Sequence, residues 1–405
     1  MLNTGNTTKC LPGLHLILLL CLLYPFNIRA ETFNSCKAVP DLVRFVETNR
    51  GWKALRPIGC KELPKTAFKK RGLAQIWSII DKHHLQKLGE LYKLVGLIDN
   101  SYDFYSCYLE ETSRHTEAFY DAIHNEIILP SWKKTPRNVL VHEIVHALQD
   151  QIIDLHKLAK RAAAISDQSL AFSAFIEGDA SLVQHHFIQH VKQGREFEIP
   201  FENPQPTIDS ECKFPPALDA LIYFPYDFGL VFAERIRERK GWEALTKVYD
   251  QIPISTTQII HAKAHPILTP SQVIFEPKRI LDFLDIPSGK IVLEDTVGQY
   301  MTRLILGQFL DQPQAIRASV GWRGDKALVY KSESGRVLAW RTQWNSERDA
   351  DEFRSALVKM YATRFSTSLQ SESKILLMEI QNGDKLFVRS GGQAVDVVYS
   401  SLGAN

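Results

Sequence analysis

The sequence predicts an α+β protein in which a mainly helical part with a small sheet is followed by a smaller α+β part. Three observations favour this fold class. Apolar residues recur at helical spacing over much of residues 73–252, segments 117–121 and 126–129 have the pattern of two short strands joined by a turn, and strand-like runs become frequent after about residue 270. We divide the chain accordingly into residues 1–30, 31–116, 117–270 and 271–405.

Residues 1–30 have the features of a secretory signal peptide. Lys9 precedes an apolar run over residues 16–26, after which the chain becomes polar. The run is too short to span a bilayer comfortably, which favours cleavage near Ala30 over the alternative, an uncleaved N-terminal anchor. We therefore expect an exported protein (periplasmic, cell-surface or secreted) with no stable membrane span after signal cleavage.

The composition is that of a globular protein, with 45% hydrophobic and 23% charged residues in a chain of 405. Of 48 basic and 46 acidic residues, Lys9 and Arg29 would leave with the signal peptide, so the mature chain would have 46 of each. This balance argues against nucleic acid or an anionic membrane as a partner, because both bind surfaces with a basic excess. The sequence does not indicate an oligomeric state.

Four cysteines would remain in the mature chain, namely Cys36, Cys60, Cys107 and Cys212. In an exported protein they are expected to form two disulfides, with three possible connectivities. The alternative is four buried thiols. The wide spacing contains no CxxC pair, which argues against a cysteine zinc site.

Two helices are expected in the central part of the chain. Thr135 is a suitable cap and Pro136 a suitable first residue for a helix whose apolar residues continue to Leu155. A second helix is expected over residues 166–191, followed by a polar, proline-rich loop over residues 193–216. Further segments are predicted as helices at 217–252, 294–306 and 347–362, and as strands at 326–330, 337–343, 375–380, 385–388 and 395–399.

An HExxH motif at residues 142–146 is the strongest chemical signal. Four helical residues turn the chain by about 400°, so His142 and His146 lie on one face, one turn apart, and can hold one zinc ion. Glu143 lies about 100° round the helix, close enough to take a proton from a water on that metal. The alternative is a pair of solvated histidines on an ordinary helix.

Glu177 is the leading candidate for a third metal ligand, which would leave a fourth position open for water. It follows His146 by 31 residues, a gap that suits an antiparallel helical return. It ends the largely apolar stretch 170–176, so we expect it to point inward, where a buried carboxylate needs a partner such as a metal. Gly178 and Ala180 would leave little side-chain bulk near that metal. The alternative is a solvated charge.

An HExxH motif followed by a glutamate in a Glu-Gly-Asp-Ala context resembles the pattern of the gluzincin zinc metallopeptidases. The longer string HEIVHALQDQ is similar to a group of largely uncharacterised exported bacterial proteins in that clan. Further similar strings are Phe-Pro-Tyr at 224–226, Gly-Trp at 241–242, and the segments 257–261 and 321–325, so the resemblance covers about residues 117–353. It implies a zincin-like catalytic domain over residues 117–270.

The resemblance also implies roles for individual residues. His142, His146 and Glu177 would bind Zn²⁺, and Glu143 would be the general base and then the proton donor to the leaving amine. A histidine or tyrosine downstream would stabilise the oxyanion, for which His261 is the first choice and Tyr226 and Tyr223 are the second.

Two features of the family's pattern are missing. Thermolysin, the familiar example of this clan, has Asn directly before the glutamate ligand and Asp four residues after it, whereas this chain has Ile176 and Ser181. The side chains that orient the zinc histidines must then come from elsewhere, and Asp150 and Asp179 are candidates. Gluzincins also hold the substrate backbone against an edge strand, a role that the strand at 126–129 could have unless it is an interior strand.

The sequence thus predicts an exported zinc metallopeptidase that acts on a peptide or protein. A first alternative is a surface or periplasmic interaction protein that keeps the metal as a structural element. A second is a zinc hydrolase of a non-peptide amide, such as a cell-wall component. A third is a latent enzyme whose cleft is covered by the N-terminal helices or the C-terminal part.

Overall fold

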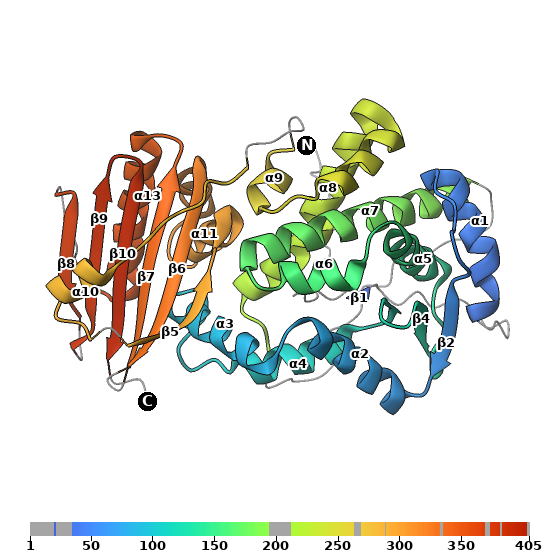
Figure 1. Cartoon of the computed structure of the whole chain (residues 1–405), viewed down its shortest axis with the longest axis horizontal. Helices are drawn as coiled ribbons and strands as arrows, with labels where there is room; N and C mark the ends of the chain where they lie inside the picture. Colours follow the sequence, from blue (N-terminus) through green and yellow to red (C-terminus); the bar gives the residue numbers. More distant parts are fainter. Residues whose placement is uncertain are drawn as a thin grey trace, which may run out of the picture.

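A computed structural model describes most of the chain after the N-terminal segment. The described ranges are residues 20–21, 35–193, 212–262, 269–287, 289–332, 335–368, 373–380 and 383–402. The predicted signal peptide lies outside these ranges except for Leu20 and Cys21, and so does most of the predicted loop at 193–216. Figure 1 shows a mainly helical body beside a module built around a larger sheet. The predicted α+β fold class is confirmed.

The helical body has two long central helices with shorter helices around them (Figure 1). Its helices are α1 (Val39–Arg50), α2 (Lys65–Ile79), α3 (Lys82–Leu94), α4 (Phe104–His115), α5 (Arg137–Ile152), α6 (Leu155–Ala162), α7 (Ser166–Gln193), α8 (Pro216–Lys247) and α9 (Thr256–Ile260), with 3-10 turns η1 (Ser35–Ala38) and η2 (Val248–Asp250). The expected first residue of α5 is wrong by one position, because Pro136 is extended and precedes the helix without a side-chain cap. The expected continuation to Leu155 is also wrong, since Asp154 caps a new helix, α6, by accepting from the backbone N–H of Lys157.

The four cysteines form the disulfides Cys36–Cys60 and Cys107–Cys212. The first links the turn before α1 to the small sheet, and the second links α4 to the segment before α8. The structure therefore selects one of the three possible connectivities, and the alternative of four free thiols does not hold.

The small sheet lies beside α5 and has the order β1-β3-β4-β2. Its strands are β1 (Leu20–Cys21), β2 (Gly59–Leu63), β3 (Ala118–Asp121) and β4 (Glu126–Pro130). The predicted hairpin is confirmed, with Asn125 in the turn at a positive φ of 55°. The strand at 126–129 is not an edge strand, because β4 is paired on both sides. β3, the other strand of the hairpin, pairs with β4 on one side and antiparallel with β1 on its other edge.

The larger sheet is antiparallel throughout, with the order β5-β6-β7-β10-β9-β8. Its strands are β5 (Lys290–Asp295), β6 (Trp322–Ser332), β7 (Gly335–Trp344), β8 (Ile375–Glu379), β9 (Lys385–Gly391) and β10 (Ala394–Leu402). The five predicted strands are confirmed. The helix expected from residue 294 is partly wrong, because Leu293 and Asp295 are buried on either side of exposed Glu294, the alternation of a strand.

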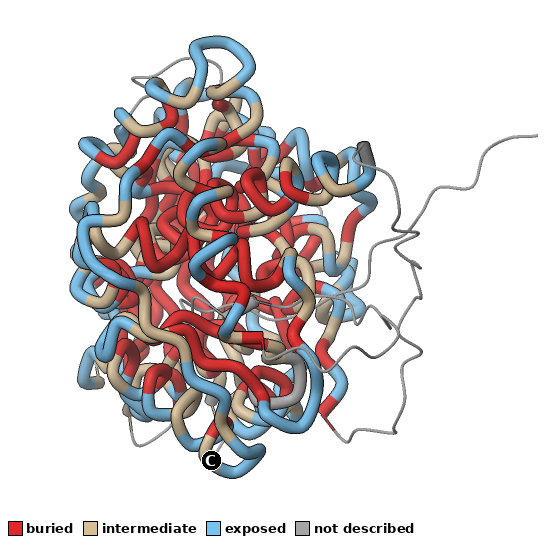
Figure 2. Tube along the Cα trace, turned by 90° about the vertical axis from the view of Figure 1, so that its right-hand side faces the viewer, coloured by how far each residue is buried: buried red, intermediate tan, exposed pale blue. Residues whose placement is uncertain are grey.

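Helices cover both faces of this sheet. α11 (Gly298–Gly307), α12 (Gln312–Ser319) and α13 (Glu347–Arg364) pack into the core that the sheet shares with the helical body. α10 (Lys278–Phe283) packs on the other face, in front of the sheet in Figure 1. Ile280 and Leu281 of α10 pack with Phe387 and Val398 of the sheet in a small separate core. The remaining buried apolar residues form one large core that extends from α1 to β10, so the helical body and the sheet module share their interior. Figure 2 shows these buried residues gathered inside a rim of exposed ones.

Three buried carboxylates lie where the sheet module meets the helical body, and one of them, Asp295, links the two parts directly. Asp295 of β5 accepts from the backbone N–H of Ser166 at the start of α7 (2.7 Å), and Asp167 accepts from the backbone N–H of Thr256 at the start of α9 (3.0 Å). Asp325 of β6 accepts from the backbone N–H of Gly298 at the start of α11 (2.8 Å). Each carboxylate thus satisfies backbone N–H groups at a helix N-terminus, where negative charge is favourable.

This junction predicts a pH-dependent stability. Burial raises the pKa of Asp295 to about 6 and that of Asp325 to about 7, against the nearby backbone N–H donors that lower both, and Asp167 adds to each increase. Because these folded-state values exceed those of an unfolded chain, the folded state binds more protons above about pH 4, and stability falls as pH rises through 6 and 7. Thermal unfolding between about pH 5 and pH 8 should show this loss. Asp325→Asn should flatten the profile, and an equally steep profile in that variant would contradict the assignment.

Candidate metal centre

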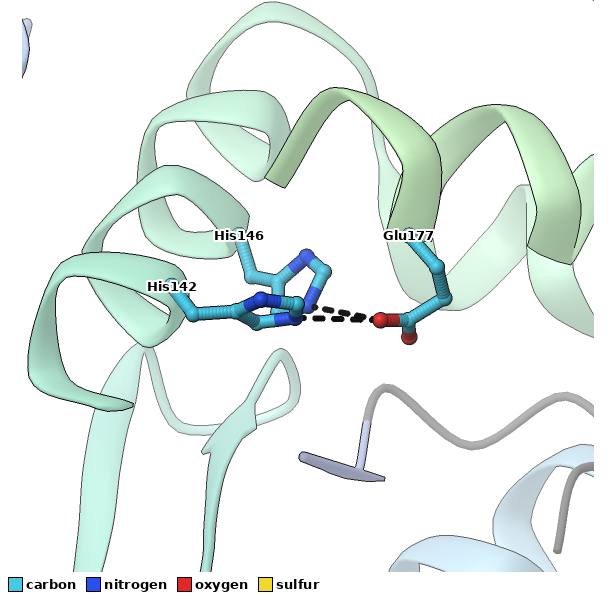
Figure 3. Close-up of side chains that lie close together, drawn as sticks. All are labelled: His142, His146 and Glu177. Atoms are coloured by element: carbon cyan, nitrogen blue, oxygen red, sulfur yellow. Dashed lines mark hydrogen bonds and ion pairs between the residues drawn. The ribbon is translucent and has the colours of Figure 1, made fainter. Parts of the chain in front are cut away.

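His142, His146 and Glu177 meet in the interior of the helical body. The two histidines project from α5 side by side toward Glu177, which descends from α7 (Figure 3). Nε2 of His142 lies 3.0 Å and Nε2 of His146 lies 3.6 Å from Oε2 of Glu177. One ligand atom from each residue falls within 4.8 Å of the others, and the three side chains are buried. These three residues could hold a metal ion.

Antiparallel packing of α5 against α7 creates this meeting point. His142 contacts Gln184, whereas Gln149, two turns further along α5, contacts the carbonyl of Ile176. Later residues of α5 therefore contact earlier residues of α7, so the two helices are antiparallel, as the spacing between His146 and Glu177 predicts. Gly178 does not face the metal site, because a Cβ at this position would lie 2.2 Å from the carbonyl oxygen of Gly229 on α8.

Two glutamines orient the imidazole rings. Oε1 of Gln184 lies 3.1 Å from Nδ1 of His142, and Oε1 of Gln149 lies 2.8 Å from Nδ1 of His146. An amide oxygen only accepts, so each Nδ1 carries a proton, and Nε2 is the ring atom that faces Glu177 in both histidines. Nε2 of His146 is buried and makes no hydrogen bond with any described residue. A buried ring nitrogen without a hydrogen-bond partner, beside a carboxylate, fits a bound cation.

Charge in the site also favours a cation. Burial lowers the pKa of His142, so this ring is neutral near pH 7. Burial also opposes ionisation of Glu177, but His146 and His142 outweigh it and hold the pKa of this carboxyl well below its usual range. The negative charges of Glu177 and Glu143 raise the pKa of His146 in spite of its burial. Two carboxylates and two imidazoles thus form a pocket of negative potential.

Glu143 lies next to this group without belonging to it. It is fully buried on α5, directly after His142, and its charge acts on His146. It is not one of the three residues whose ligand atoms converge. Glu143 thus places a second buried carboxylate next to the three converging residues.

The two aspartates expected to orient the zinc histidines do not contact them. Asp150 accepts from Tyr120 (2.9 Å) and from Arg56 (3.0 Å) at the small sheet. Asp179 pairs with Arg50 and accepts from Tyr249 (2.7 Å). Two glutamines contact the histidines instead, and the sequence prediction did not include them. Gln149 lies three residues after His146 on the same helix.

The candidates for oxyanion stabilisation are separated by the structure. Tyr226 on α8 has its ring centroid 6.4 Å from that of His142. His261, at the end of α9, instead has its Nε2 3.1 Å from Oε1 of Gln299 on α11. Tyr223 lies one turn before Tyr226 on α8. Tyr226 therefore lies beside the candidate metal site, whereas His261 contacts α11.

A pocket opens beside Glu177 on the side away from Gly178. Its walls come from α2, α6, α7 and the turn after β3, and they include the apolar side chains of Ile79, Leu155, Phe172 and Ile176. A group held at the metal site would therefore have an apolar recess next to it.

Comparisons with known proteins concern mainly the sheet module. Residues 289–402 match the model of a family described as a domain of unknown function (DUF8575). No curated protein and no solved structure matches this chain. Within the described ranges, no helix combines the length and hydrophobicity that a membrane span requires. The metal centre lies outside the matched residues, so its chemistry has to be inferred from its geometry.

Proposed function

We propose that this protein is an exported zinc-dependent metallopeptidase of gluzincin type. The observation that carries the proposal is the convergence of His142, His146 and Glu177, with both Nε2 atoms turned toward the carboxylate. Glu143 directly follows His142 on the same helix. Two imidazoles and one carboxylate are a donor set that suits zinc, and three protein ligands leave a position open for catalysis.

The residues around the site have complementary roles in this proposal. Zinc, when bound, would polarise the scissile carbonyl and lower the pKa of its water to about 7. Glu143 would take a proton from the attacking water and pass it to the leaving amine nitrogen. Tyr226 would donate its hydroxyl hydrogen to the oxygen of the scissile carbonyl as negative charge develops there.

The outer edge of β3 supports a peptide as the substrate. This edge pairs with the two residues of β1, which belong to the segment expected to leave with the signal peptide. Loss of β1 would free backbone groups that an extended peptide can bind in the same antiparallel manner.

Two disulfides support export, because disulfides persist mainly in oxidising compartments. Complete burial of the metal site favours the alternative of a structural metal. Structural zinc sites, however, use four protein ligands, whereas three ligand residues converge among the described residues.

Metal analysis of the mature chain, combined with digestion of a mixed peptide library, tests the proposal. We expect about one zinc per chain, loss of peptide cleavage after treatment with a chelator, and recovery on addition of zinc. Tightly held zinc without any cleavage would favour the structural-metal alternative. Absence of zinc from protein purified without chelators, and failure to take it up, would refute the metal centre itself.

A further inference from the structure

A chain of buried polar residues leads away from the metal centre behind His146. Nδ1 of His146 lies 2.8 Å from Oε1 of Gln149, whose amide nitrogen donates to the hydroxyl oxygen of Tyr249 (2.9 Å). The Tyr249 hydroxyl donates to Oδ2 of Asp179 (2.7 Å). The contacts connect α5 with η2 and then with α7, two residues after the proposed ligand Glu177.

Arg50, the last residue of α1, closes this chain. Its guanidinium donates to both carboxylate oxygens of Asp179, at 2.8 and 3.1 Å, and both side chains are fully buried. The charge lies between two indole rings, 3.8 Å from the ring centroid of Trp52 and 4.9 Å from that of Trp242. The guanidinium also donates a hydrogen bond to Oγ1 of Thr246 at 2.9 Å. Such an arginine keeps its charge and has a single orientation.

The direction of every hydrogen bond in this chain follows from its charged end. A guanidinium only donates and a carboxylate only accepts, so the hydroxyl hydrogen of Tyr249 has to point to Asp179. The Tyr249 oxygen then accepts from Gln149, whose amide oxygen is turned to His146.

A second contact fixes the same orientation of the Gln149 amide. The amide nitrogen also donates to the backbone carbonyl of Ile176 at 3.0 Å, and a carbonyl cannot donate. The ring of His146 must therefore donate from Nδ1, which leaves Nε2 as the atom available to a metal.

We propose that Arg50, Asp179, Tyr249 and Gln149 form a positioning relay that fixes the tautomer and orientation of His146 for metal binding. None of the four is proposed to touch the metal or the substrate. The proposal rests on the proposed metal centre and does not depend on peptidase activity. It gives the N-terminal helix α1, which precedes the HExxH motif by almost a hundred residues, a direct effect on a metal ligand.

The proposed test is the zinc affinity of Tyr249→Phe, measured by competition with a chromogenic chelator. This variant keeps the ring but removes the hydroxyl that links Gln149 to Asp179. Partners that orient a metal-binding histidine are worth about 10- to 100-fold in affinity. Because the Ile176 carbonyl still holds the amide, we expect a loss near the lower end, about tenfold. Tyr300→Phe is the matched control, since it removes a buried hydroxyl that donates to the carbonyl of Ala220 (3.3 Å), and its affinity should stay within about twofold of wild type.

A double variant separates positioning from general damage to the fold. Gln149→Leu should weaken zinc binding by about 10- to 100-fold, and adding Tyr249→Phe should cause no further loss, because Tyr249 acts through Gln149. Arg50→Lys, which keeps the charge on Asp179, should retain more affinity than Arg50→Met. The relay would be overturned if the loss of zinc affinity in the double variant equalled the product of the two single losses. It would also be overturned if Tyr249→Phe folded normally and bound zinc as tightly as wild type.

A readout without metal keeps the relay testable if the metal centre fails. Nitrogen-15 NMR of metal-free protein, at alkaline pH where the ring is neutral, should show the proton of His146 on Nδ1 in the wild type. In Gln149→Leu the proton should be shared between the two nitrogens. A wild-type ring protonated mainly on Nε2 would refute the relay, whereas lack of zinc binding with the expected tautomer would refute only the metal centre.

Discussion

Glu143→Gln is expected to keep its zinc while peptide cleavage falls by about two to four orders of magnitude. Glu143 is fully buried and lies beside the three proposed ligands, but is not one of them. Glutamine keeps the shape of the side chain and avoids the cavity that alanine would leave, yet it cannot take a proton from water. Zinc content per chain and the initial rate of library cleavage, measured on the same preparation, report the two properties separately.

Glu177→Gln is the matched comparison, because it makes the same chemical change at a proposed ligand. Removal of that charge from between His142 and His146 should weaken zinc binding and therefore lower cleavage through loss of metal. Excess zinc should restore part of the cleavage in Glu177→Gln and none of it in Glu143→Gln. Undiminished cleavage by Glu143→Gln would exclude the general-base role.

The three proposed metal ligands are the part of the site that could be predicted from sequence, and the reason is geometric. His142 and His146 are one helical turn apart, so their common face follows from helix geometry alone. Glu177 required one further assumption, an antiparallel return of the chain, which the pairing of Gln149 with Ile176 confirms. The same local logic located the strand pair of the small sheet and most strands of the larger one.

The side chains around the ligands could not be predicted, because their positions depend on contacts between distant segments. Arg50 meets Asp179 across 129 positions of the sequence, and Gln149 meets Tyr249 across 100. Neutral amides orient the histidines where carboxylates were expected, and composition does not distinguish these solutions. The choice of Tyr226 over His261 likewise depends on how α8 and α9 pack.

Gly229→Ala is expected to destabilise the protein strongly, although it adds a single methyl group. A Cβ on Gly229 would lie 2.0 Å from the carbonyl oxygen of Ala174, and the facing Gly178 has a matching contact of 2.2 Å with the carbonyl oxygen of Gly229. Overpacking usually costs about 1–3 kcal/mol, and more where neighbours cannot move. In Gly229→Ala the methyl group would meet the backbone of α7, which cannot move aside easily. We therefore expect the free energy of unfolding, measured by chemical denaturation, to fall by an amount at or above the upper end of this range.

The same variant should also lose metal affinity, because the crossing of α7 and α8 positions both sides of the site. Glu177 directly precedes Gly178, and Tyr226 lies one turn before Gly229, so separating the helices moves both side chains relative to His142. Gly72→Ala on α2 is the matched control, since its Cβ would lie 3.8 Å from the nearest atom of Phe119. Alanine is favoured over glycine within a helix by about 1 kcal/mol, so that control should be at least as stable as wild type. Wild-type stability in Gly229→Ala would mean that the two helices do not cross this closely, and the placement of Tyr226 beside the metal centre would then lose its support.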